Sequence, residues 1–181
     1  SELRPTGNRI REVLFDWLQF EIATSRCLDL FAGSGALGIE SLSRGAESAT
    51  FIESDQKTGL FLQANLKSLD VTNGFVYSTS ATKWLECLSH IDPFDIVFLD
   101  PPFKNNLLID CCKLLENKSV ISEGGFIYIE TNNDLNLKAL PLSWRLKYER
   151  RAGNVSFYLY RRDKKVAIQI WILSVCTRYL L

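Results

Sequence analysis

Short apolar runs alternate with helix-like segments through most of the chain, and this alternation constrains the fold more than any other feature. The apolar runs lie at 26–31, 48–53, 75–78, 94–100 and 125–130. The helix-like segments lie at 8–20, 36–44, 57–69, 82–89 and 107–115. Nearly continuous apolar strands separated by helices are typical of a parallel sheet that is covered on both faces. The sequence therefore predicts an α/β fold with a doubly wound, mostly parallel sheet.

The last part of the chain follows a different pattern. Residues 144–151 and 155–162 resemble two strands, joined by the turn signal Ala152-Gly153-Asn154. We therefore expect a sheet of about seven strands that ends in an antiparallel ribbon, within one domain over residues 1–165. The tail at 166–181 contains an apolar run at 166–175 that is far shorter than the roughly 18 residues of a membrane span. We expect it to pack as an edge strand or an oligomer contact, and a disordered or non-native extension is the alternative.

Composition excludes several classes of protein. Lysine plus arginine and aspartate plus glutamate each number 21, so the net charge gives no reason to expect a polyanionic partner for the chain as a whole. The five cysteines include no CxxC pair, which argues against a disulfide framework or a zinc site and favours reduced thiols. No basic-then-apolar leader is visible. These features predict a cytoplasmic protein with no metal site and no membrane association.

A glycine-rich loop follows the first predicted strand. Gly33, Gly35 and Gly38 form the pattern GxGxxG, and Glu53 ends the second strand, where its carboxylate could accept hydrogen bonds from two ribose hydroxyls. Asp29 stands inside the first strand, where an apolar residue would be ordinary. An acid there could accept hydrogen bonds from a cationic amino-acid group, which S-adenosylmethionine has and NAD lacks. The loop therefore predicts a ribose-bearing cofactor, and Asp29 favours S-adenosylmethionine.

A second motif, Asp100-Pro101-Pro102-Phe103, ends the fourth strand. Proline has no N–H group, so the pair of prolines must end the strand and stiffen the loop. The Asp100 carboxylate and the Pro101 carbonyl offer two acceptors, and Phe103 offers a flat apolar face. This set suits the exocyclic amine of a nucleobase, with the ring stacked beneath the base. We interpret these four residues as the catalytic corner.

Three motifs together resemble the bacterial 16S ribosomal RNA guanine-N2 methyltransferase D family. They are the segment from Arg4 to Glu12, the loop from Leu28 to Gly38, and the catalytic corner, in the order and spacing of that family. The resemblance runs from about residue 4 to residue 162. Asn8 departs from the family pattern, which usually has aspartate there.

The resemblance implies a Rossmann-like fold, S-adenosylmethionine as methyl donor, and a guanine N2 amine in 16S ribosomal RNA or the assembling small subunit as acceptor. It implies that Glu53 binds the cofactor ribose and that Ser80 and Ala81 bracket the adenine. The residues that it places around the methionine part are Phe31, Gly33 and Gly35. Asp100, Pro101 and Phe103 would hold the guanine. We also expect a monomer.

Arginines are candidates for phosphate contacts. The stretch 138–165 is strongly basic and contains Arg150 and Arg151, while Arg9 and Arg11 belong to the first family motif. These four arginines are our predicted RNA-binding residues, at a surface near the catalytic end. An ordinary solvated ribbon remains the alternative for 138–165.

Three other functions remain compatible with the sequence. An adenine-N6 methyltransferase on DNA or RNA would use a similar corner, although no target-recognition domain is recognisable. An NAD-dependent oxidoreductase would use the same glycine loop but would need a proton donor, and none is evident near the fourth strand. A non-catalytic RNA-binding or assembly module could keep the fold with a degenerate pocket.

Overall fold

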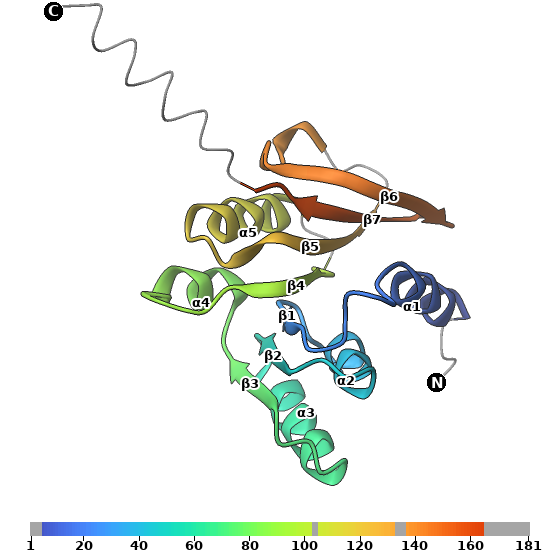
Figure 1. Cartoon of the computed structure of the whole chain (residues 1–181). Helices are drawn as coiled ribbons and strands as arrows, with labels where there is room; N and C mark the ends of the chain where they lie inside the picture. The colour runs from blue at the N-terminus through green and yellow to red at the C-terminus, as the bar shows by residue number, and fades with distance from the viewer. Residues whose placement is uncertain (1–4, 103–104, 133–136, 165–181) are drawn as a thin grey trace, which may run out of the picture.

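The computed structural model describes residues 5–102, 105–132 and 137–164, and it contains one seven-stranded sheet (Figure 1). The strands are β1 (Arg26–Asp29), β2 (Ser48–Glu53), β3 (Gly74–Ser78), β4 (Phe94–Leu99), β5 (Ile121–Asn132), β6 (Trp144–Ala152) and β7 (Val155–Arg162). The helices are α1 (Pro5–Trp17), α2 (Ala36–Ser43), α3 (Gln56–Ser68), α4 (Ala81–Cys87) and α5 (Asn105–Asn117), with a short 3-10 turn at Leu137–Ala139. Among the described residues, no helix is both long and apolar enough to span a membrane. The predicted tail at 166–181 lies outside the described residues.

The strand order is β3-β2-β1-β4-β5-β7-β6. Strands β1 to β5 pair in parallel, and β7 and β6 add an antiparallel ribbon to the edge of β5. The chain therefore runs outward from β1 to β3 and returns to place β4 beside β1. This reversal leaves a crevice at the carboxyl ends of β1 and β4, which is where open α/β sheets bind ligands. The predicted doubly wound sheet with an antiparallel ribbon is confirmed.

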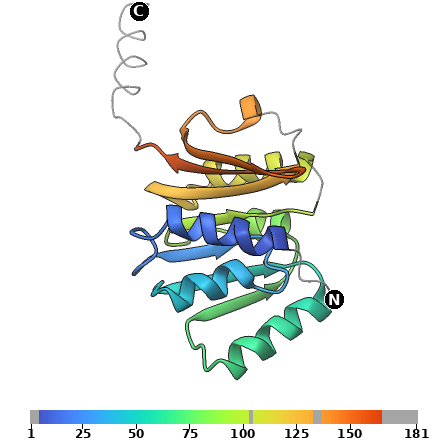
Figure 2. The ribbon, with the colours of Figure 1, turned by 90° about the vertical axis from the view of Figure 1, so that its right-hand side faces the viewer.

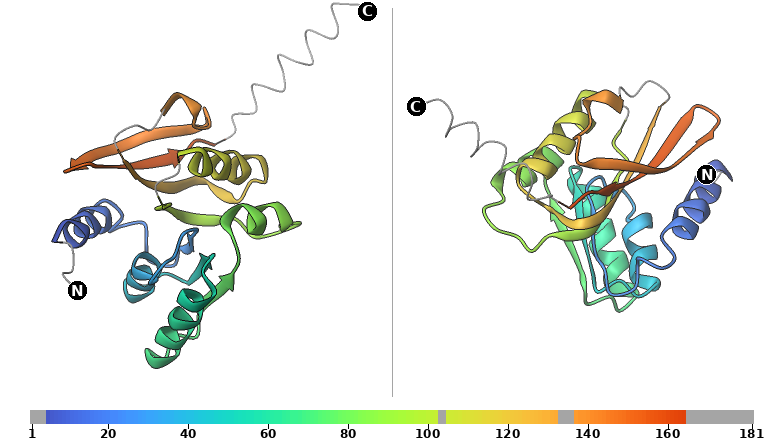
Figure 3. Two further views of the ribbon diagram at one scale, coloured as in Figure 1. Left: turned by 180° about the vertical axis from the view of Figure 1, so that it is seen from behind. Right: turned by 45° about the horizontal axis from the view of Figure 1, so that its top comes forward.

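Helices cover both faces of the sheet, as buried parallel strands require. Figure 2 shows α1, α2 and α3 in front of the sheet, and the left view of Figure 3 shows α4 and α5 on the other side. Two buried cores result. Leu14 of α1 and Leu62 of α3 pack with Phe98 and Tyr128 on one face, whereas Leu108 of α5 belongs to the core of the other face. Alternate residues of β4 and β5 therefore face different helices.

Two elements begin earlier than the sequence pattern indicates. Helix α1 begins at Pro5 rather than at residue 8, which is consistent with the preference of proline for the first turn of a helix. Strand β5 begins at Ile121 rather than at 125. Its pairing with β4 is interrupted between Ile121 and Phe126, so the regular alternation of the strand starts only after the interruption. Gly124 lies in that interruption with φ 82°, a conformation that favours glycine. The sequence pattern revealed only the regular part of this strand.

Strand β6 contains an irregularity that changes which way its residues face. Leu146 pairs with Tyr160, but the next paired residue, Tyr148, lies opposite Leu159, so Lys147 is a bulged extra residue. Tyr148 consequently turns toward α1, where it stacks on Trp17 with ring centroids 5.2 Å apart. Arg150 then faces the α1 side of the sheet, and Arg151 faces the opposite side.

A buried ion pair fixes β7 to α5. The side chain of Arg162 is only 3% exposed, and its guanidinium donates to both carboxylate oxygens of Glu116, at 2.9 and 3.0 Å, and to the carbonyl of Ile121. The indole of Trp144 donates to the same carboxylate at 3.0 Å. Burial alone would raise the pKa of Glu116, but the hydrogen bonds from Arg162 and Trp144 outweigh it and lower that pKa. The pair thus joins the ribbon to the helical layer.

Candidate active site

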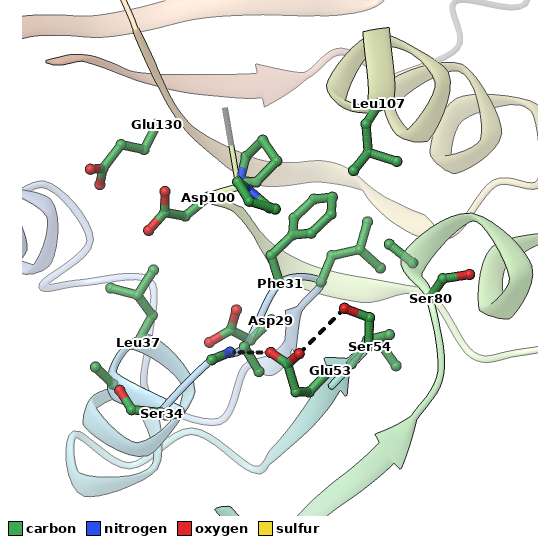
Figure 4. Close-up of a pocket in the computed structure, with 18 of the residues that line it drawn as sticks. Asp29, Phe31, Ser34, Leu37, Glu53, Ser54, Ser80, Asp100, Leu107 and Glu130 are labelled. Carbon is green, nitrogen blue, oxygen red and sulfur yellow. Dashed lines mark hydrogen bonds between the residues drawn. The ribbon is translucent and has the colours of Figure 1, made fainter. Parts of the chain in front are cut away.

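A cavity of about 620 Å³ lies at the carboxyl ends of the parallel strands (Figure 4). Its walls come from β1, β2, β4 and β5 and from the loops that follow them, so it occupies the crevice that the strand order creates. The predicted site residues that line it are Asp29, Phe31, Gly33, Glu53, Ser80, Ala81, Asp100, Pro101 and Pro102. The fold therefore brings the predicted cofactor loop and the predicted catalytic corner to one cavity. Phe103 lies outside the described residues.

The glycine loop turns sharply between β1 and α2. Gly33 and Gly35 have φ of 52° and 82°, and the Gly35 N–H donates to the carbonyl of Ala32 at 2.7 Å. Only Gly33 of these two lines the cavity, because Gly35 lies against the side chain of Leu62. A Cβ at Gly38 would collide with the ring of Phe51. The three glycines of the motif therefore serve the turn and the close packing of α2 on the sheet.

Glu53 braces this loop from the end of β2. One of its carboxylate oxygens accepts from the Gly33 N–H at 2.8 Å, and the other accepts from the Ser54 hydroxyl at 3.4 Å (Figure 4). The second oxygen also accepts from the Asp55 N–H at 2.7 Å. A carboxylate has about four acceptor positions, so the oxygen that accepts from Gly33 retains one, and rotation of the Ser54 hydroxyl frees a second on the other oxygen. Glu53 thus lies where two ribose hydroxyls could donate to it while it holds the loop.

Asp29 is a buried acid with little compensation. It is 2% exposed, and its carboxylate accepts from the Gly38 N–H at 3.3 Å. Burial raises its pKa to about 7, the charge of Glu53 adds to the rise, and the backbone N–H groups of Gly38 and Phe31 oppose it. Because Asp29 lines the cavity, a cation placed beside it would stabilise its charged form.

Ser80 and Ala81 form the start of α4 on the far wall of the cavity. The hydroxyl of Ser80 accepts from the backbone N–H of Lys83 at 3.4 Å and caps the helix. Leu107 of α5 and Ile52 of β2 line the same side. This part of the cavity is therefore largely apolar, as the face of an aromatic ring requires.

Glu130 is a site residue that our sequence analysis missed. It lies one position beyond the register pair Leu99–Ile129, and Asp100 lies one position beyond the same pair on β4. In Figure 4 the carboxylates of Asp100 and Glu130 point to the same side, and both line the cavity. The hydroxyl of Tyr128 donates to one oxygen of Glu130 at 2.9 Å. The position of Glu130 at the end of the fifth predicted strand was the signal that could have identified it.

The two neighbouring carboxyl groups influence each other. Desolvation by surrounding protein atoms raises the pKa of Asp100, and the charges of Glu130 and Asp29 raise it further. Desolvation also raises the pKa of Glu130, against the hydrogen bond from Tyr128. Hydrogen-bond donors placed between two such neighbouring carboxyl groups would stabilise their ionised forms.

A second hollow of about 280 Å³ adjoins the cavity on the α1 side of the sheet. It shares Ala36, Leu37, Asp100 and Glu130 with the cavity, and α1 supplies the opposite wall. The residues that α1 contributes are Gly7, Asn8, Ile10 and Arg11. The guanidinium of Arg11 donates to the side-chain carbonyl of Asn8 at 3.0 Å. The sequence motif on α1 and the catalytic corner are therefore two walls of one hollow.

The four predicted RNA-binding arginines occupy different positions. Arg11 lines the second hollow, and Arg9 is exposed on α1 and lines neither cavity. Arg150 and Arg151 are both exposed on β6 but face opposite sides of the ribbon. Fewer basic side chains of 138–165 can contact phosphate than the charge of this stretch indicates, because Arg162 is buried and forms an ion pair with Glu116.

Within the described ranges 5–102, 105–132 and 137–164, no group of three histidine, cysteine, aspartate or glutamate side chains is arranged to hold a metal ion. Cys27, Cys111 and Cys112 are free and buried, and burial raises the pKa of each thiol. These cysteines therefore pack in the cores as small apolar side chains.

Comparison with known proteins identifies the family. The family described as "conserved hypothetical protein 95" matches residues 1–161. Ribosomal RNA small subunit methyltransferase D of Escherichia coli K12 is 42% identical over 161 residues, which cover 89% of this chain and 80% of that protein. The protein of the same name from Buchnera aphidicola of Acyrthosiphon pisum is 43% identical over 158 residues, which cover 87% of this chain and 82% of the relative.

A solved structure agrees with these relatives. The putative methyltransferase yhhF from Escherichia coli superposes with a TM-score of 0.81 at 41% identity, and the match covers 86% of each chain. The resemblance that the three sequence motifs indicated is therefore confirmed, and so is the expectation of an enzyme that transfers methyl groups. The chain belongs to the ribosomal RNA small subunit methyltransferase D family.

Proposed function

We propose that this protein transfers a methyl group from S-adenosylmethionine to the exocyclic N2 amine of a guanine in small-subunit ribosomal RNA. The observation that carries the proposal is the single cavity that joins Asp29 and the Glu53-braced loop to Asp100 and Pro101. The names of the family relatives support a small-subunit ribosomal RNA as substrate. Ribosomes assemble in the cytoplasm of bacteria, so we expect the protein to act there.

The residues of the cavity fit S-adenosylmethionine. Its ribose hydroxyls would donate to Glu53, its adenine would lie against the apolar wall near Ser80 and Ala81, and its ammonium would lie near Asp29. The buried, under-compensated carboxyl of Asp29 is the specific evidence, since NAD offers no primary ammonium to it. When bound, the cofactor supplies an electrophilic methyl group on a sulfonium. Phe31 and Gly33 would shape the loop around its methionine part.

The catalytic corner would orient the acceptor amine. The carboxylate of Asp100 and the carbonyl of Pro101 would each accept one N2 hydrogen, which favours localisation of the nitrogen lone pair toward the methyl group. Pro101 and Pro102 hold these acceptors in a stiff loop at the end of β4. Such positioning and preorganised acceptors account for much of the rate in a displacement that needs no metal.

A methylation assay tests the proposal. Small ribosomal subunits from cells that lack the enzyme would be incubated with labelled S-adenosylmethionine, and the modified nucleoside would be identified by mass spectrometry. We expect N2-methylguanosine; N6-methyladenosine, or no methylated nucleoside, would refute the proposal. Asp100→Ala should lower the rate at least about 100-fold and leave the affinity for S-adenosylhomocysteine within a few-fold.

Asp92→Asn is a matched control for that variant. Asp92 is an acid near the amino end of β4, highly exposed, with a weak contact to Arg26 at 3.6 Å. The Asp92→Asn variant should leave both the methylation rate and the affinity for S-adenosylhomocysteine unchanged. If Asp100→Ala lost affinity for S-adenosylhomocysteine together with its thermal transition, Asp100 would be a structural residue rather than a catalytic one. Calorimetry with NAD should show no binding, and a protein that bound NAD alone would belong to a different class of enzyme.

A further inference from the structure

We propose that Glu130 reads the N1–H group of the target guanine and so makes the enzyme specific for guanine over adenine. This inference rests on the proposed function, because it names a specificity-determining residue for the same reaction. It starts from the placement of Glu130 beside Asp100. Glu130 does not belong to any of the three family motifs.

The geometry provides two acceptors side by side. Asp100 and Glu130 follow the register pair Leu99–Ile129 on neighbouring strands, which lie about 4.8 Å apart in a sheet. Both side chains face the α1 side of the sheet and line the cavity and the second hollow alike (Figure 4). A base that presents its amine to Asp100 therefore presents the adjacent ring position to Glu130.

Tyr128 occupies one of the two carboxylate oxygens of Glu130 and leaves the other for a ligand. Its hydroxyl donates to one carboxylate oxygen at 2.9 Å, and no other hydrogen bond to Glu130 is found within the described residues. The second oxygen is therefore available to a donor in the hollow. Glu130 is partly exposed there, so a ligand can reach it.

The edges of the bases match this arrangement differently. Guanine presents two adjacent donors, the N1–H and the N2 amine, to the two adjacent carboxylates. Adenine and cytosine present an amine next to an unprotonated ring nitrogen, so Glu130 would face a lone pair. An acceptor that the bound base shields from water and leaves opposite a lone pair is costly, and a site built on a substrate N–H strongly rejects an analogue that lacks it.

The α1 wall completes the recognition of guanine. Asn8 lines the hollow and accepts from Arg11 through its carbonyl, a bond that does not use its amide N–H groups. Arg11 also lines that wall, and its guanidinium has five N–H donors, more than the bond to Asn8 uses. These N–H groups supply the donors that the guanine O6 atom needs. The two acceptors and the opposite donors thus follow the hydrogen-bonding pattern of one base.

The test uses one altered base. The methylated guanosine is first mapped, and small subunits are then reconstituted with rRNA that carries either guanosine or 2,6-diaminopurine at that position. Both bases have the 2-amine, but 2,6-diaminopurine has an acceptor at N1 and a second amine in place of O6. The comparison therefore tests the N1 and O6 contacts together, and the Glu130 variant below assigns the N1 part. The protein should methylate guanosine with a kcat/KM at least roughly 10- to 100-fold higher, since the hydrogen bond to the charged Glu130 is lost together with the contacts to O6. Equal kcat/KM values for the two bases would overturn the inference.

Glu130→Gln should shift this preference. The Tyr128 hydroxyl would donate to the new side-chain carbonyl and leave the amide nitrogen facing the hollow, where it can donate to N1 of 2,6-diaminopurine. We expect the ratio of the two kcat/KM values to fall at least about tenfold, with unchanged affinity for S-adenosylhomocysteine. Loss of activity on both bases alike, with that affinity intact, would show that Glu130 does not read N1.

Two further proteins complete the design. Glu123→Gln changes an exposed acid on the same strand β5 and should leave the ratio unchanged. Tyr128→Phe removes the hydroxyl that orients Glu130 and should lower kcat/KM for guanosine more than for 2,6-diaminopurine, which gives a second readout if Glu130→Gln does not fold. If the unaltered protein methylated neither base at N2, the proposed function itself would fail, an outcome distinct from equal use of both bases.

Discussion

Protonation of Asp29 should control how tightly the cofactor binds. This acid is buried, lines the cavity, and has a pKa near 7 in the free protein, with Glu53 and Asp100 as its charged neighbours. An ammonium group beside it would favour the ionised form and lower that pKa, so binding must release a proton whenever Asp29 is protonated beforehand. Affinity should therefore rise with pH and level off above neutrality.

The size of the effect follows from the pKa. With a pKa of about 7, roughly one tenth of Asp29 is ionised at pH 6 and roughly nine tenths at pH 8, so the association constant should rise about tenfold over that interval. Calorimetry with S-adenosylhomocysteine measures this directly. In two buffers of different ionisation enthalpy, binding should release about 0.9 proton at pH 6 and about 0.1 at pH 8.

Asp29→Asn separates this group from the other acids of the cavity. The variant should bind more weakly and lose most of the pH dependence, because the amide does not titrate. Two outcomes would refute the reasoning: an association constant of the unaltered protein that is flat from pH 6 to pH 8, or a slope that persists in Asp29→Asn. The second would assign the proton to Asp100 or Glu130.

Three other changes test separate parts of the structure. Glu53→Ala should weaken binding of S-adenosylhomocysteine about 10- to 100-fold in calorimetry, because the ribose loses a charged acceptor, and an unchanged affinity would remove Glu53 from the cofactor site. Arg150→Glu should weaken binding to small-subunit rRNA and flatten its salt dependence more than Arg151→Glu, since only Arg150 faces the α1 side; equal effects in a filter-binding titration would contradict this. Glu116→Gln should lower the free energy of unfolding in urea by about 3 kcal/mol, because Arg162 stays buried with one partner weakened. The difference in unfolding free energy between the two proteins should shrink at acidic pH, because Glu116 of the unaltered protein becomes protonated as the pH falls through its lowered folded pKa. A difference below about 1 kcal/mol at neutral pH would show that the ion pair contributes little.

The sequence was sufficient to predict the sheet and most of its site. Alternation of apolar runs with helical patterns is a local signal, and the carboxyl ends of parallel strands meet at one edge whatever the details of packing. Asp29, Glu53 and Asp100 could therefore be placed at a common crevice from the pattern of residues alone. The structure adds their hydrogen bonds and their electrostatic coupling.

The features that sequence reasoning missed depend on pairing between strands. Glu130 lies beside Asp100 only because of the register of β5 against β4. Arg162 looked like part of a basic surface, but its partner Glu116 is 46 residues away and only the packing of α5 on the sheet brings them together. Gly35 packs against Leu62, a contact between two segments far apart in the sequence. No periodicity within one segment encodes these distances.

The bulge at Lys147 makes strand β6 tolerant of one specific change in length. Because Lys147 is the extra residue, its deletion would leave Leu146 opposite Tyr160 and Tyr148 opposite Leu159, with a regular ladder between them. A deletion two positions later, at Glu149, would instead invert the facing of every residue from there to the turn and carry Arg150 away from the α1 side. Insertions and deletions in the ribbon are thus constrained unequally at neighbouring positions, and an alignment of relatives with a gap in this strand should place it at the bulge.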